Sequence, residues 1–336
     1  MVQKREKMKK PIIALMAVSL LLSNLYATVT TRSFGAFDIS FYNNGDNNNY
    51  LTSQQNWTEQ QIFDVGTAIS AWTSGIGNTA GRQIQMHLFW NEMDTGLSSG
   101  IIGGSASVKV TNTISQWNFG EYVYKKQGTL QSSTGFDTII QFDITGGGYD
   151  WNFGNETPAS DTIDFRSVVA HEVGHSLGWD SSFDAQYDDW GWFWLSQTQG
   201  NYYGLTDWDK NLVDGSGNVP LNGGYGTPGN FNQVDNPVYW QGENAVSYYG
   251  EFVPIYAPGV FKSGSSLEHL DEGLLGNLLM SPMIGPGQMV RDVSDLEWAM
   301  MADMGWQLVP EPGTLAILTL SMAWLRFRNK NRWIAQ

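Results

Sequence analysis

Alternating apolar and polar residues predict three β-strands in the first half of the chain. Each candidate is short and has the two-residue period of a strand with one buried face. The third candidate runs directly toward a segment with helical periodicity. The three segments are 34–42 (FGAFDISFY), 84–90 (IQMHLFW) and 136–144 (FDTIIQFDI).

Two helices are predicted by capping boxes, in which a hydroxyl side chain is followed three residues later by Glu or Gln. The first begins at 58–61 (TEQQ) and the last at 294–297 (SDLE). Apolar residues at helical spacing follow each box, until Gly75 ends the first helix and Gly305 ends the last.

The order of these elements predicts an α+β fold. Strand, helix, strand, strand and helix follow one another, so we expect an N-terminal mixed sheet with two helices. Beyond Gly178 the chain is rich in Gly, Asn and aromatic residues and has little periodicity until 294. This predicts an irregular C-terminal subdomain that ends in a helix. Because no internal repeat or low-complexity linker interrupts it, residues 28–308 are expected to form one catalytic unit.

Both ends of the chain have the composition of processing signals. Residues 1–27 carry five basic side chains, then the apolar run PIIALMAVSLLL and a small residue, Ala27. This is typical of a secretory signal peptide, and the alternative is a single membrane anchor. Residues 309–336 contain Pro310-Glu311-Pro312, a short apolar run and four basic residues. A basic end favours the cytoplasmic side, so this tail predicts transient C-terminal anchoring in the inner membrane.

The order of features in the tail resembles the PEP-CTERM sorting signal of Gram-negative bacteria. The resemblance implies removal of the tail by an exosortase-type processing enzyme. It also implies export to the cell surface or an extracellular matrix. The alternative is an ordinary C-terminal anchor.

Without its two ends the chain is strongly acidic. Residues 28–308 hold nine basic and 31 acidic residues, a net charge of −22, which argues against nucleic acid as a partner. The chain has no cysteine, so any metal must be held by His, Asp or Glu. Acidic segments at 46–50 (DNNNY) and 184–190 (DAQYDDW) are candidates for Ca²⁺, with solvated acidic surface as the alternative.

The segment 168–182 (VVAHEVGHSLGWDSS) contains the sequence HExxH. A helix capped by Asp161 or Thr162 would place His171 and His175 on one face, one turn apart, so that both can bind one zinc ion. Glu172 lies beside them and is placed to act as a general base on a water molecule. A zinc ion would acidify that water and polarise the scissile carbonyl. The motif therefore predicts metal-assisted hydrolysis of a peptide bond.

HEVGHSLG also resembles the helix of metzincin-type zinc metalloproteases, which ends at a glycine equivalent to Gly178. In that family a third ligand follows three residues later, but this position is Ser181, which binds zinc poorly. The later segment 264–283 (GSSLEHLDEGLLGNLLMSPM) resembles the leishmanolysin-like branch. In that branch a long insertion precedes the third histidine and a Met-turn. The resemblance implies a zincin-like fold in which Met280 lies beneath the ligands, with Met283 as the competing position.

The third zinc ligand is predicted to be His269, because a catalytic zinc needs three protein ligands and an open position. The chain has four histidines, and His87 lies on the polar face of its strand, where we expect a surface residue. Asp180 is the rival ligand, but it falls one residue too early for the metzincin spacing.

Together these features predict a secreted zinc endopeptidase that acts on a protein or peptide substrate. The alternative is a catalytically inactive zincin-fold protein that binds a surface or extracellular matrix. The presence of Glu172 favours the enzyme, because a protein that has lost its catalytic activity often loses its general base first.

Overall fold

The computed structural model describes the greater part of the central region of the chain. The described residues are 29–76, 83–93, 101–107, 109–111, 116–118, 135–181, 183–185, 193–195, 197–198, 201–202, 206–218 and 237–309. The predicted signal peptide, and the predicted sorting tail apart from Val309, therefore lie outside the described residues. None of the helices in the described part combines the length and the apolar character needed to cross a bilayer.

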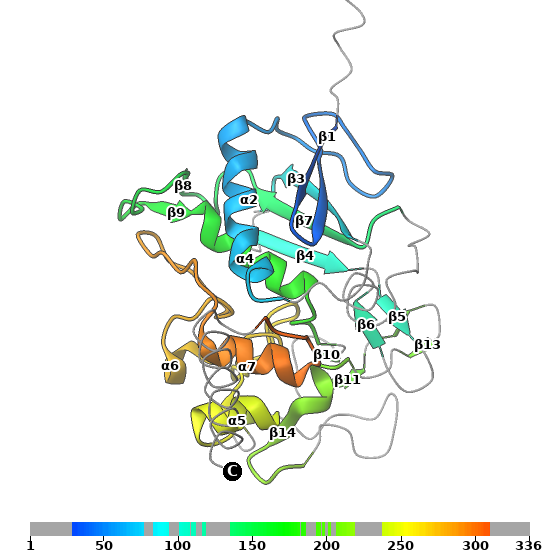
Figure 1. Ribbon diagram of the computed structural model, residues 1–336, viewed down its shortest axis with the longest axis vertical. Coiled ribbons are helices and arrows are strands. Elements are labelled where there is room, and N and C mark those ends of the chain that lie inside the picture. Colours follow the sequence, from blue (N-terminus) through cyan, green and yellow to red (C-terminus); the bar gives the residue numbers. More distant parts are fainter. Residues whose placement is uncertain are drawn as a thin grey trace, which may run out of the picture.

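A five-stranded mixed sheet forms the upper half of the molecule (Figure 1). Its strand order is β1-β2-β3-β7-β4, with β2, β3 and β7 parallel and both outer strands antiparallel to their neighbours. The strands are β1 (Thr30–Phe34), β2 (Phe37–Phe41), β3 (Ile84–Asn91), β4 (Gly103–Ser107) and β7 (Thr138–Asp143).

The structure corrects one predicted strand. The segment 34–42 is not continuous, because the chain reverses at Gly35, whose φ is +56°, and forms a hairpin of β1 and β2. Glycine adopts this left-handed conformation without the clash that a Cβ would cause. The predictions of strands at 84–90 and 136–144 are confirmed by β3 and β7.

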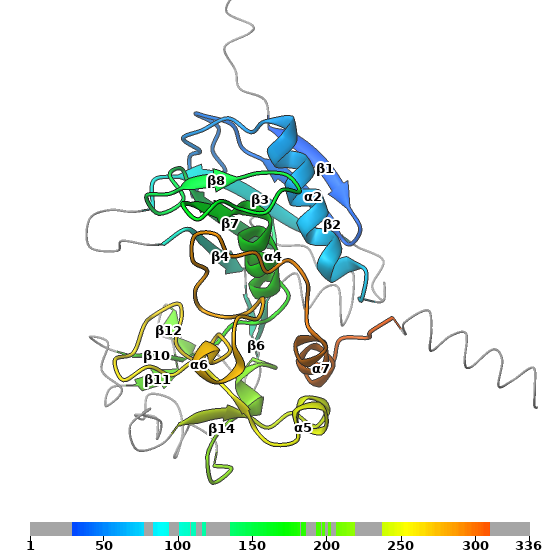
Figure 2. The same cartoon turned by 90° about the vertical axis from the view of Figure 1, so that its left-hand side faces the viewer.

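Two helices, α2 (Glu59–Thr73) and α4 (Phe165–Ser176), cover one face of the sheet (Figure 2). The predicted capping box of α2 is present: the Thr58 hydroxyl accepts a hydrogen bond from the Gln61 backbone N–H, and the Gln61 side-chain oxygen accepts one from the Thr58 backbone N–H. Trp72 of α2 donates its indole N–H to Ala170 O of α4 at 2.7 Å. The apolar side chains of β3 on this face, among them Met86 and Leu88, are buried against the two helices.

The opposite face of the sheet is also covered, which corrects the prediction for His87. A second apolar cluster of Tyr42, Phe89, Phe136 and Ile139 lies there, and His87 is half-buried among its rings. Its Nδ1 lies 3.1 Å from the Tyr42 hydroxyl, and burial lowers the pKa of His87 to about 4. The polar alternation of β3 identified the correct face, but the aromatic residues that cover it come from distant segments.

The described part of the lower half of the molecule contains short strands and short helices (Figure 1). A three-stranded sheet has the order β14-β15-β16, and helix α7 has the predicted Ser294–Glu297 capping box. The structure combines a mixed sheet with a few helices, which is an α+β fold. The remaining elements are β5 (Lys109–Thr111), β6 (Gln116–Asn118), β8 (Asp150–Asn152), β9 (Thr162–Asp164), β10 (Phe183–Ala185), β11 (Phe193–Leu195), β12 (Gln197–Thr198), β13 (Asn201–Tyr202), η4 (Asp209–Asn211), β14 (Leu212–Asp214), β15 (Val238–Trp240), α5 (Glu243–Tyr249), β16 (Val253–Pro254), α6 (Glu272–Leu275) and α7 (Asp295–Asp303).

Helix α4 begins later than the sequence predicts. Asp161 and Thr162 do not cap it, because Thr162 opens strand β9, which pairs with β8. The N-cap is Asp164, whose carboxylate accepts hydrogen bonds from the Ser167 backbone at 3.0 Å and from the Ser167 hydroxyl at 2.6 Å.

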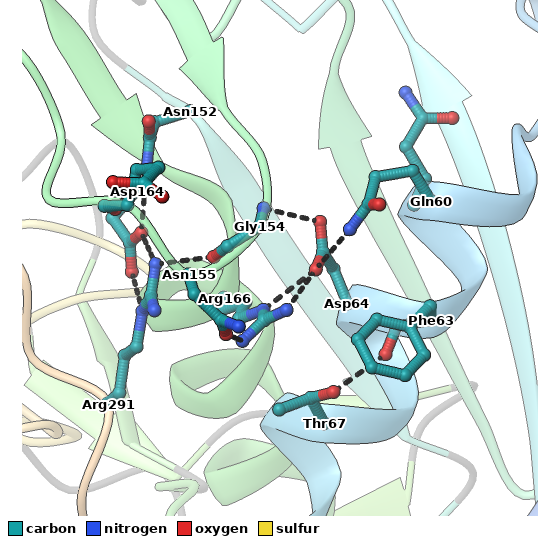
Figure 3. A network of polar contacts seen from close by, with 12 residues as sticks. Gln60, Phe63, Asp64, Thr67, Asn152, Gly154, Asn155, Asp164, Arg166 and Arg291 are labelled. Carbon is teal, nitrogen blue, oxygen red and sulfur yellow. Dashed lines mark hydrogen bonds and ion pairs between the residues drawn. The ribbon is translucent and has the colours of Figure 1, made fainter.

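A buried polar network fixes the start of α4 against the rest of the molecule (Figure 3). Asp64 of α2 forms an ion pair with Arg166 of α4, at 2.6 Å. The same carboxylate accepts the Gly154 backbone N–H, and the Gly154 carbonyl accepts a hydrogen bond from Arg291. Arg291 also pairs with the Asp164 carboxylate. The network thus joins α2, the start of α4 and the loop before α7.

Removing one charge of the Asp64–Arg166 pair should be strongly destabilising, because both side chains are at most 4% exposed. Leaving one charge buried without its partner lowers the stability of the folded protein by about 3–5 kcal/mol. We therefore expect Asp64→Asn to lower the free energy of unfolding by about 3 kcal/mol or more, measured by urea denaturation. The exposed Arg32–Glu59 pair provides the control: Glu59→Gln should cost less than about 1 kcal/mol. Equal effects of the two substitutions would contradict the role given to the buried pair.

Candidate metal centre

Three histidines from two distant segments meet at one point. His171 and His175 project from α4, and His269 comes from the loop before α6. Their Nε2 atoms form a triangle with sides of 3.1, 3.1 and 3.2 Å. Among the described residues, these are the only three His, Asp or Glu side chains that lie close enough together to share one metal ion.

Each of the three rings is oriented by a backbone carbonyl at its other nitrogen. The Nδ1 of His171 lies 2.7 Å from Leu279 O, and the Nδ1 of His269 lies 2.8 Å from Ser265 O. The Nδ1 of His175 contacts Trp179 O. A carbonyl oxygen only accepts hydrogen bonds, so each Nδ1 carries the proton.

The tautomers leave three Nε2 lone pairs directed at the same point. None of these nitrogens has a proton to donate to another, so their approach to 3.1–3.2 Å is not a set of hydrogen bonds. Three converging lone pairs repel one another unless a cation lies between them. The geometry therefore forms a site that can hold a metal ion.

The electrostatic surroundings keep the rings of His171 and His269 neutral. Burial, together with the neighbouring His175, lowers the pKa of His171 to about 3. Burial and the two other rings hold the pKa of His269 well below its ordinary value. Only neutral imidazole has a free lone pair, so His171 and His269 stay in the metal-binding form throughout the neutral pH range.

The three histidines lie in a cleft of about 780 Å³ between strand β4, helix α4 and the loops at 263–290. Glu172 lines the same cleft and is only 6% exposed, and burial raises its pKa to about 8. Gly103 of β4 allows this approach, because a Cβ there would lie 2.9 Å from Glu172 Oε1. The cleft thus places a carboxyl group beside the metal-binding nitrogens.

Met280 forms an apolar support under the turn of α4 that carries the histidines. It is fully buried, and a Cβ on Gly174 would lie 2.9 Å from its Cε and 3.0 Å from Trp72 Cζ2. This close packing requires glycine at position 174, between His171 and His175. Met283, in contrast, is 61% exposed at the cleft.

A buried carboxylate whose sequence pattern predicts only a helix cap also holds the Met280 loop in place. Glu297 of α7 accepts the Met280 backbone N–H at 2.7 Å with Oε1, while Oε2 accepts from Ser294. The adjacent Leu279 carbonyl binds His171. The capping-box pattern identifies Glu297, but it carries no signal for the second contact, which depends on the tertiary structure.

Neither Asp180 nor Ser181 belongs to the histidine group. Asp180 is half-buried and lines the cleft, while its carbonyl accepts a hydrogen bond from Thr206. Ser181 is buried, and its hydroxyl donates a hydrogen bond to the Asp209 carboxylate at 2.7 Å. The position where the metzincin spacing would place a ligand is therefore used to anchor the loop that follows α4.

Neither of the two acidic segments predicted to bind Ca²⁺ contains a metal-binding group among the described residues. Asp46 accepts a hydrogen bond from the Asn43 backbone, and it forms no group of three His, Asp or Glu side chains among the described residues. Most of the segment 184–190 lies outside the described residues.

No protein-family model matches the chain, and no curated protein or solved structure is significantly similar to it. Its function is therefore inferred from the residues and geometry of the cleft.

Removing a ligand should separate His269 from its rival Asp180. We expect His269→Ala to lose the bound metal, because two imidazoles leave the ion without its third ligand. Asp180→Ala should keep the metal, since Asp180 lies outside the group. Metal content per chain, measured by mass spectrometry after dialysis, tests this directly. Loss of metal in Asp180→Ala with retention in His269→Ala would contradict the assignment.

Proposed function

We propose that this protein is an exported zinc-dependent endopeptidase in which Glu172 is the general base. The observation that carries the proposal is the convergence of three Nε2 lone pairs in a cleft that Glu172 also lines. Three neutral imidazoles with one open position are the ligand set of a catalytic zinc site, whereas structural zinc sites have four protein ligands.

The dimensions of the triangle support zinc as the metal. Two Zn–N bonds of about 2.0–2.1 Å at a tetrahedral angle hold their nitrogens about 3.4 Å apart. The observed separations of 3.1–3.2 Å are slightly shorter, so a zinc ion fits after a small outward movement of the rings. The chain has no cysteine, and neutral imidazole suits zinc, so the donor chemistry supports the same metal.

The residues of the chain then have distinct roles in hydrolysis. When bound, zinc acidifies a water molecule and polarises the scissile carbonyl. The charge of a bound ion would lower the pKa of Glu172 that burial raises, so its carboxylate would accept the proton of the attacking water and pass it to the leaving amine. The water oxygen bonds to the carbonyl carbon, the C–N bond breaks, and a carboxylate and an amine are released. The carbonyl partners of the three rings fix their orientation throughout.

A zincin-like fold of the leishmanolysin-like type is part of this proposal. Its support is a helix that carries two ligands beneath a mixed sheet, a third histidine 94 residues after His175, and a methionine under the helix. Because Ser181 is bonded to Asp209 and Asp180 lies outside the histidine group, His269 is left as the residue that completes the site.

Export to the cell surface or extracellular matrix of a Gram-negative bacterium is proposed from the chain ends alone. The signal peptide at 1–27 and the PEP-CTERM-like tail at 309–336 would be processed by a signal peptidase and an exosortase-type enzyme. A protein or peptide is then the substrate, met outside the cytoplasm. The net charge of −22 in residues 28–308 argues against nucleic acid as a partner.

Replacing the base while keeping the ligands tests the mechanism. Glu172→Gln preserves the size of the side chain but cannot accept a proton, so we expect zinc content to be unchanged. Hydrolysis of a casein or peptide-library substrate should fall by about 100-fold or more.

His175→Ala is the matched variant, and it should lose both zinc and activity. Full activity in Glu172→Gln would exclude Glu172 as the base. Zinc binding at one equivalent without cleavage of any substrate by the unaltered chain would favour the inactive, surface-binding alternative.

A further inference from the structure

His269 is the one histidine of the metal-binding group that does not lie on a helix. The backbone of α4 fixes His171 and His175 relative to each other, whereas His269 lies in a loop. The three Nε2 lone pairs repel one another, so in the metal-free protein this repulsion acts to move the loop away from the helix. A restraint from outside the histidine group would keep His269 in place.

The backbone just before His269 has a conformation that leucine rarely adopts. Leu267 has a φ of +71°, in the left-handed region, and its side chain is fully buried. Among the described residues the only other non-glycine residue with a positive φ is Asn49, and Asn tolerates that region better than Leu. An unfavourable conformation persists only where surrounding contacts hold it, and such residues concentrate at functional sites.

Two hydrogen bonds hold Leu267 in this conformation. Its N–H donates to Tyr256 O at 2.9 Å, and its carbonyl accepts the indole N–H of Trp208 at 2.6 Å. That carbonyl belongs to the peptide bond that follows Leu267, so the indole fixes a peptide plane one residue before His269. The Tyr256 backbone N–H also donates to His269 O at 2.8 Å. The short segment from Leu267 to His269 is therefore bound at both ends.

Trp208 is packed against the segment that follows α4. It is fully buried, and its ring centroid lies 4.8 Å from that of Trp179. The Trp179 carbonyl contacts Nδ1 of His175. Two neighbouring tryptophans thus bind the two ligand segments, one through a carbonyl at His175 and the other through an indole at Leu267.

Two further contacts join the turn at 206–211, which contains Trp208, to the end of α4. The Thr206 hydroxyl donates to Asp180 O at 3.1 Å. The Ser181 hydroxyl donates to the Asp209 carboxylate at 2.7 Å, and the same carboxylate accepts the Thr206 backbone N–H at 3.0 Å. The turn therefore connects the segment after α4 with the loop that carries the third histidine.

From these contacts we infer that Trp208 is a positioning residue for His269 and acts through the peptide bond that follows Leu267. The inference rests on the proposed metal site, and it gives a role to part of the long segment between His175 and His269. The turn at 206–211 keeps His269 directed at the other two ligands before a metal binds. Without the indole hydrogen bond, the peptide plane would rotate and the repulsion between the Nε2 atoms would move His269 outward.

A variant that loses only the indole N–H tests this role. Trp208→Phe keeps an aromatic ring against Trp179 but cannot donate to Leu267 O. We expect its dissociation constant for Zn²⁺, measured by competition with a chromophoric chelator, to rise by about 10- to 100-fold. The matched control is Trp151→Phe, which removes an indole bond of 2.8 Å to Asp143 O, outside the segments that carry the histidines. The control should bind Zn²⁺ as tightly as the unaltered protein.

Hydrogen exchange in the metal-free protein separates positioning from a general loss of stability. The amides of Tyr256, Leu267 and Leu270 are hydrogen-bonded, so they should be protected before any zinc is added. In metal-free Trp208→Phe we expect these amides to exchange about five- to tenfold faster, the factor for the loss of one hydrogen bond. The amides of β3, in the centre of the sheet, should keep their rates, whereas a general loss of stability would raise the rates of both groups.

The unaltered protein tests the inference even if Trp208→Phe fails to fold. Protection of the three loop amides without zinc would support it. Rapid exchange that slows only when zinc is added would show that the metal organises the loop, and would overturn the inference.

The outcomes distinguish this inference from the proposed function. Unchanged zinc affinity in Trp208→Phe, or an equal loss of affinity in Trp151→Phe, would overturn the role of Trp208 and leave the metal site intact. Failure of the unaltered protein to bind zinc would overturn the proposed metal site, and this inference with it. Zinc binding without hydrolysis of any substrate would overturn the proposed peptidase activity but not the role of Trp208.

Discussion

The repulsion between three neutral imidazole nitrogens is the constraint on which the centre of this molecule depends. Carbonyl groups at Leu279, Trp179 and Ser265 hold each ring so that its Nε2 lone pair faces the other two. Without a cation this arrangement is unfavourable, and with one it supplies three ligands already oriented. Metal binding is therefore expected to stabilise the folded chain, because the unfolded chain has no such site.

The surrounding structure is built to hold these rings in place. Asp164 caps α4 and binds Arg291, so the helix that carries two ligands is joined to the loop that forms the apolar wall of the cleft. Glu297 holds the Met280 backbone, and Met280 in turn packs against Gly174 between the two helical ligands. Buried polar groups of this kind act by fixing geometry, since a half-satisfied network would weaken the fold.

The sequence predicts the local elements well and the long-range contacts poorly. Capping boxes and periodicity identified α2, α7, β3 and β7, because these signals lie within a few residues. The histidine spacing of α4 follows from helical geometry alone. The hairpin at Gly35, the cap at Asp164 and the cover over His87 were not predicted, because each depends on how a distant strand or ring packs. Glu297 illustrates the same limit, since only one of its two roles is local.

The most direct test of the account is to locate the metal. A crystal of the zinc-loaded protein, measured on both sides of the zinc absorption edge, shows the ion as an anomalous peak. One peak is expected, within about 2.0–2.1 Å of the Nε2 atoms of His171, His175 and His269. A peak bound by Asp180 with His269 remote from it, or no peak at the three histidines, would contradict the account.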